Sequence, residues 1–124
     1  MDIPSGLKTT FLVHFIVALV FGLLFLLVPQ VWATMGGYQI TEPTMYRLVG
    51  AAILAFGASS WLGYRETAYE RVKIVVATEI VWTVLATLVM VYALLFASFP
   101  PMGWINALIM AIFAVLFGYF YMRK

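Results

Sequence analysis

Long apolar runs separated by short polar breaks are the main pattern in this chain. Four runs of about 20 residues or more carry almost no charged side chains, and each can cross a hydrocarbon layer of about 30 Å at 1.5 Å per residue. No linker between them is long enough to separate domains. The sequence therefore predicts one all-α domain over residues 1–124, a bundle of four transmembrane helices at about 9–28, 45–64, 74–97 and 102–122.

The breaks between the runs have clear local causes. Pro29 closes the first run, and Pro43 lies where the second begins, a position that suits proline in a helix. Residues 65–73 form a charged turn, and Pro100-Pro101 forces a short hinge before the last run. We expect residues 30–44 and 98–103 to be loops on one side of the membrane.

Composition supports a lipid environment. Hydrophobic residues make up 65% of the chain and charged residues 10%, whereas a soluble domain carries about a quarter charged residues. The net charge of +2 is explained by basic loop residues that set topology, so we expect no nucleic-acid partner. The chain contains no cysteine, which excludes thiolate chemistry and iron–sulfur ligation.

The basic residues predict an orientation. Arg47 falls on one side of the four-helix arrangement, and all the other basic residues fall on the opposite side, which the positive-inside rule assigns to the cytoplasm. The N-terminus, the central loop and the C-terminus are then cytoplasmic in a multi-pass protein of the cell membrane. The residues that define this side are Lys8, Arg65, Arg71, Lys73, Arg123 and Lys124.

Small residues recur at four-residue spacing in three of the helices, a pattern typical of closely packed membrane helices. The third helix instead carries a polar stripe made of Glu79, Thr83 and Thr87. The small pairs and triplets are Ala18 and Gly22, then Ala51, Ala55 and Ser59, then Ala107 and Ala111, and then Ala114 and Gly118.

Counting residues from the membrane boundaries places an inner polar layer. His14 is six residues past Lys8 and Glu79 is six past Lys73, so both lie about 9 Å inside the cytoplasmic boundary. Intramembrane ionisable groups are functional hypotheses by default. We take His14, Glu79, Ser59 and Thr83 as candidates for a ligand- or proton-binding site, with Ser60 and Thr78 near the same depth. A buried hydrogen bond between helices is the structural alternative.

A second polar layer lies near the outer boundary. Arg47 is four residues past Pro43, and Asn106 is four past Met102, so both lie about 6 Å inside. We assign Arg47 and Asn106 a structural role, because arginine at this depth reaches the headgroups or caps neighbouring helix ends. One histidine and one carboxylate fall short of a metal site, and a lone histidine does not indicate haem, so we expect no metal and no cofactor.

Several stretches resemble a known group of membrane proteins. FGLLFLLVP closes the first helix, RLVGAAILAFGASSW lies in the second and GWINALIMAIFAVLFGYF in the fourth. With the Arg-Leu-x-Gly-Ala stretch at 47–51, the Gly103-Trp104 pair and the acidic Glu79, the chain is similar to the small four-helix prokaryotic membrane proteins of the DoxX-like group. The resemblance implies their fold and topology, and that group has no settled activity.

Three functions remain open. The leading interpretation is a non-enzymatic membrane protein that acts by helix association, as a homo-oligomer or as an accessory subunit whose partners are other transmembrane helices. The alternative is a small proton-coupled transporter or a binder of a small lipophilic ligand at the His14/Glu79 layer. The third is a lipid- or isoprenoid-processing enzyme that uses the same two residues as an acid–base pair.

Overall fold

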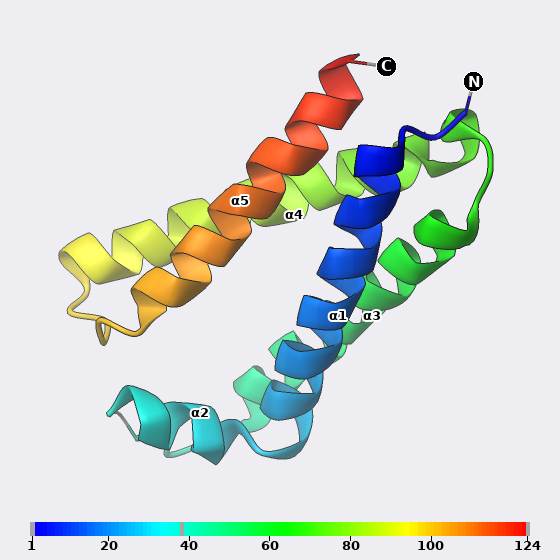
Figure 1. Ribbon diagram of the computed structural model, residues 1–124. Coiled ribbons are helices and arrows are strands. Elements are labelled where there is room, and N and C mark those ends of the chain that lie inside the picture. The colour runs from blue at the N-terminus through cyan, green and yellow to red at the C-terminus, as the bar shows by residue number, and fades with distance from the viewer. Residues whose placement is uncertain (1, 38, 124) are drawn as a thin grey trace.

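A computed structural model of the protein describes residues 2–37 and 39–123, and in that part of the chain the fold is helical (Figure 1). Four of the helices are long and apolar enough to cross a membrane, so the chain is a multi-pass membrane protein. Lys124 lies outside the described residues. The helices are α1 (Ser5–Leu27), α2 (Pro29–Gly36), α3 (Thr44–Arg65), α4 (Tyr69–Phe96) and α5 (Gly103–Arg123).

The four predicted spans are confirmed, with shifted ends, and a fifth helix was missed. The prediction of a loop over residues 30–44 is wrong in its first part, because Pro29 starts α2 at the first helical position, where its missing N–H is not needed. This short helix ends at Gly36, and the next residue, Gly37, has a φ of +77°, which suits glycine. The prediction of a charged turn over 65–73 is also wrong in part, since α4 begins at Tyr69.

The long helices form two antiparallel pairs, α1 with α3 and α4 with α5, and contacts within each pair are far denser than contacts between the pairs. Glycine makes the α1–α3 contact close. A Cβ atom on Gly50 would lie 2.6 Å from the backbone nitrogen of Leu26 and 2.8 Å from the carbonyl oxygen of Gly22. Gly57 similarly faces Ala18. The first-helix pair Ala18 and Gly22 is buried as expected, whereas Ala51 and Ala55 of α3 are exposed, so the packing face of α3 is its glycine face.

The buried core lies at one end of the molecule, which we call the terminal end because α1 starts and α5 finishes there (Figure 1). The two pairs meet through large side chains at this end, and an isolated β-bridge joins Asp2 to Ala68. At the opposite end, which we call the α2 end, the pairs lie apart. The core consists of Ile3, Leu7, Phe11, Tyr69, Val72, Val76, Phe113, Phe117 and Phe120.

The α3–α4 connection at the terminal end is polar. The Glu66 carboxylate accepts hydrogen bonds from the Thr67 backbone N–H and from Arg71 Nη1, both at 3.1 Å. These two donors hold the pKa of Glu66 below its ordinary value, because they stabilise the ionised carboxylate. Charged residues therefore occupy the first turn of α4 while Tyr69 and Val72 on its other face enter the core.

We expect Gly50→Ala to weaken the α1–α3 pair, because the added methyl group meets backbone atoms that cannot rotate away. The free energy of unfolding should fall by about 1–3 kcal/mol, measured by denaturant titration in mixed micelles. Gly118→Ala is the matched control, since a Cβ atom added to Gly118 would have no heavy atom of another part of the fold within 4 Å. Equal stability of the two variants would contradict the glycine contact.

Candidate functional site

His14 lies on α1 at the inner edge of the core and is 3% exposed. Its Nδ1 forms a hydrogen bond of 2.8 Å with the Ser60 hydroxyl on α3, and its Nε2 lies 3.1 Å from Glu79 Oε2 on α4. An imidazole that is protonated at Nε2 toward the carboxylate accepts the Ser60 O–H at Nδ1. One side chain thus connects three helices through polar contacts.

The fourth long helix contacts the same imidazole through aromatic rings. The centroid of the Phe113 ring lies 4.8 Å from that of His14 with the planes at 90°, and the Phe117 ring lies at 5.7 Å with the planes at 79°. These edge-to-face contacts are a favourable arrangement for aromatic rings. His14 is therefore the point at which α1, α3, α4 and α5 meet.

Glu79 has no exposed surface. Its Oε2 is close to His14 but outside hydrogen-bond geometry, and neither carboxylate oxygen has a hydrogen-bond partner among the described residues. A buried carboxyl group without hydrogen bonds is destabilising, so the nearby imidazole is the group that keeps it inside the protein. The sequence placed His14 and Glu79 at one depth, and the fold brings them into contact.

The hydroxyl group that contacts His14 is not one of the two predicted as site residues. Ser60, rather than Ser59, reaches His14, because one residue along a helix turns the side chain by about 100°. The Ser59 hydroxyl donates to the Phe56 carbonyl, and the Thr83 hydroxyl donates to the Glu79 carbonyl at 2.7 Å. The hydroxyl groups of Ser59 and Thr83 therefore donate hydrogen bonds within their own helices and not to His14. Thr83 is nevertheless fully buried beside Glu79.

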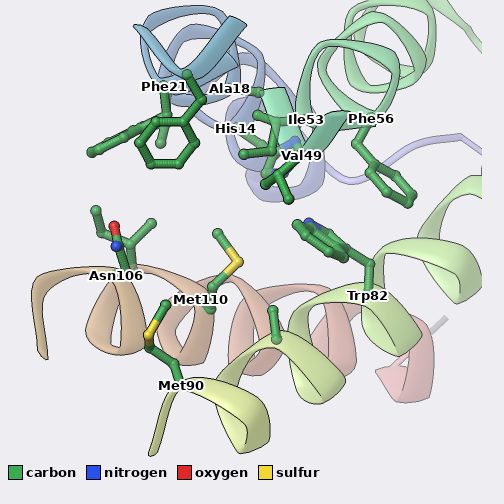
Figure 2. A pocket seen from close by; sticks show the side chains of 14 residues that line it. His14, Ala18, Phe21, Val49, Ile53, Phe56, Trp82, Met90, Asn106 and Met110 are labelled. Atoms are coloured by element: carbon green, nitrogen blue, oxygen red, sulfur yellow. The ribbon is translucent and has the colours of Figure 1, made fainter. Parts of the chain in front are cut away.

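A cavity of about 120 Å³ begins at His14 and lies between the two helix pairs. Figure 2 shows side chains of α1 and α3 facing those of α4 and α5 across it, with Phe56 and Trp82 approaching each other at one side and Phe21 opposite Asn106 at the other. The Phe56 and Trp82 rings are stacked at 5.1 Å. Of its lining residues, His14 and Asn106 are polar and the rest are apolar: Val17, Ala18, Phe21, Phe25, Val49, Ile53, Phe56, Trp82, Ala86, Met90, Ile109 and Met110.

A second cavity, of about 230 Å³, continues this one toward the α2 end. Trp32 of α2 and Tyr46 of α3 lie on its wall. The two cavities are adjacent, because Phe25, Val49, Met90 and Asn106 line both.

The two members of the predicted outer layer have different surroundings. Asn106 lines both cavities, whereas Arg47 is exposed on the outside of α3 and lines neither. Among residues 2–37 and 39–123, no three His, Cys, Asp or Glu side chains come close enough to hold a metal ion. The cavity was not predicted from the sequence. Its lining is made mostly of common apolar residues, and the sequence does not specify which face of each helix turns toward the other helices.

Comparison with known proteins adds no assignment. No protein-family model, no curated protein and no solved structure matches the chain. The resemblance to the DoxX-like group therefore stays a prediction.

A double-mutant cycle measures the free energy of the contact between His14 and Glu79. We expect His14→Phe and Glu79→Leu each to lower the free energy of unfolding by about 1–3 kcal/mol, because each leaves a buried polar partner unpaired. The double variant should lose less than the sum, with a coupling of about 0.6–1.7 kcal/mol. Denaturant titration in mixed micelles gives these values. Thr87→Val is the control, because its hydroxyl bonds the Thr83 carbonyl of its own helix; strict additivity of the two central variants would exclude the contact.

Proposed function

We propose that the protein binds a lipophilic molecule inside the membrane, in the cavity between the two helix pairs. The observation that carries the proposal is the cavity itself, whose wall is apolar apart from His14 and Asn106. Ligand sites are concave and mostly apolar, with a few polar groups that fix orientation. The second cavity extends the apolar wall toward the α2 end, and we place the entry of a molecule from the surrounding lipid there.

Binding is better supported than transport. A transported molecule would have to pass His14 and leave at the terminal end, and large buried side chains fill that end, including Phe11, Phe117 and Phe120. The contact of His14 on α1 with Glu79 on α4 joins the two pairs at the end of the cavity where His14 lies. We assign the His14–Glu79 contact the role of closing the cavity there.

The orientation and location in the cell membrane are part of this proposal. Lys8, Arg65, Arg71 and Lys73 lie toward the terminal end, and Arg47 lies near the α2 end. The positive-inside rule then places the terminal end in the cytoplasm and opens the cavity toward the outer leaflet.

Filling the cavity tests the proposal. Ala86→Phe places a benzyl group in the space that the cavity occupies. We expect lipophilic molecules that co-purify with the gently extracted protein to fall by about tenfold, because overpacking of this kind weakens binding by about 1–3 kcal/mol. Native mass spectrometry measures the bound fraction. The matched control, Ala93→Phe, lies two turns farther along α4 and outside the lining residues, and equal loss in both variants would refute a site in the cavity.

A second candidate function is association with other transmembrane helices, in a homo-oligomer or as an accessory subunit. The observation that favours it is the exposed alanine stripe of α3, made of Ala51, Ala55 and Ala58, which turns away from α1. Small residues on a lipid-facing surface allow another helix to approach closely.

The alanine stripe makes a separate prediction. If copies associate through it, Ala51→Leu with Ala58→Leu should reduce energy transfer between differently labelled copies in lipid vesicles, because the larger side chains keep the backbones apart. Val115→Leu, on the exposed surface of α5, should leave the transfer unchanged. Absence of transfer in the unaltered protein would rule out self-association.

A further inference from the structure

Asn106 is the polar group of the cavity that lacks a partner. Its side chain lines both cavities and is half-buried, and no hydrogen bond or ion pair joins it to another described residue. Figure 2 shows it facing the space between the pairs. An amide in an apolar environment without a hydrogen bond is destabilising, so a bound molecule with a polar group would stabilise it.

The inner end of the cavity offers no comparable group. Both nitrogens of His14 already face protein partners, Ser60 Oγ at 2.8 Å and Glu79 Oε2 at 3.1 Å. The indole ring of Trp82 lies on the cavity wall. A hydrocarbon chain end fits beside these rings, and a polar head can bond Asn106, which no described residue hydrogen-bonds.

The length of the cavity and the charge of the residues that line it limit the kinds of molecule that can bind there. Asn106 is seven residues before Phe113, which contacts His14, so the two ends of the cavity are about 10 Å apart along α5. No Asp, Glu, Lys or Arg is among the described residues that line the two cavities. An ionised head would lie there without a counter-charge, which is unfavourable in an apolar site. The first cavity has a volume of about 120 Å³, which suits one chain rather than two.

We propose that the occupant is a neutral lipid with one hydrocarbon chain, whose hydroxyl or ester head hydrogen-bonds the Asn106 carboxamide while its chain extends toward His14. The inference rests on the proposed function, because it specifies the molecule that the cavity binds. A carboxamide both donates and accepts hydrogen bonds, so it matches a head that carries a hydroxyl and a carbonyl group.

Tryptophan quenching tests the orientation. The protein carries Trp32→Phe, Trp61→Phe and Trp104→Phe, so that Trp82 is its remaining tryptophan, and it is reconstituted in phosphatidylcholine vesicles. The probes are two monoacylglycerols, one brominated near the methyl end of its chain and one brominated beside the ester. We expect saturable quenching that is stronger with the methyl-end probe, because Trp82 lies toward the His14 end. Stronger quenching by the ester-side probe would overturn the orientation.

Asn106→Leu tests the head contact in the same assay. Loss of one hydrogen bond to a neutral group should weaken binding of the methyl-end probe about fivefold. A brominated fatty-acid anion with the same chain should bind more weakly than the monoacylglycerol and should be insensitive to Asn106→Leu. A version that retains Trp61, on the exposed side of α3, in place of Trp82 controls for quenching from bulk lipid: its quenching should not saturate and should not change with Asn106→Leu.

The outcomes separate the two proposals. If Ala86→Phe abolishes saturable quenching and Asn106→Leu leaves it unchanged, the cavity binds lipid but the assignment of the head to Asn106 is wrong. If the unaltered cavity shows no saturable quenching with any probe, the single-chain lipid is wrong, and the proposed function fails with it if no lipophilic molecule co-purifies with the protein.

Discussion

The contact of one imidazole with four helices is the constraint on which the rest of the fold depends. His14 meets Ser60 and Glu79 through polar atoms and the rings of Phe113 and Phe117 through edge-to-face contacts. Interhelical polar contacts in membranes stabilise only modestly on average, but a buried carboxyl group deprived of its neighbour is strongly destabilising. The contact therefore fixes the depth and rotation at which the two pairs can meet.

The cavity between the two helix pairs can persist because the solvent around the protein is lipid. Within the α1–α3 pair, Gly50 and Gly22 allow backbone atoms to approach closely, and dispersion then holds the pair together. Between the pairs the facing side chains are large, as at Phe56 and Trp82. In water such a gap would close, but lipid chains are as apolar as the side chains, so there is little hydrophobic force to close it. A cavity of this kind is accordingly compatible with a stable membrane protein.

The sequence was sufficient for properties that depend on position along a helix and insufficient for those that depend on rotation about it. Hydropathy located four spans, and counting from Lys8 and Lys73 put His14 and Glu79 at one depth. To predict which serine, Ser59 or Ser60, contacts His14, one must know how α3 is rotated about its axis relative to α1. The side-chain types alone do not specify this rotation.

The same limit applies to the outer polar layer, whose two members the sequence places at one depth. Depth alone grouped Asn106 with Arg47, but the fold turns Asn106 into the cavity and leaves Arg47 outside. The cavity is thus polar at two levels with different chemistry: an inner level where both imidazole nitrogens face protein partners, and an outer level where the Asn106 carboxamide has no hydrogen bond to a described residue. Glu79 lines neither cavity, so only His14 of the acid–base pair faces the first cavity, whereas binding at the outer level leaves the His14–Glu79 contact intact. The arrangement therefore favours recognition of a lipid over its chemical conversion.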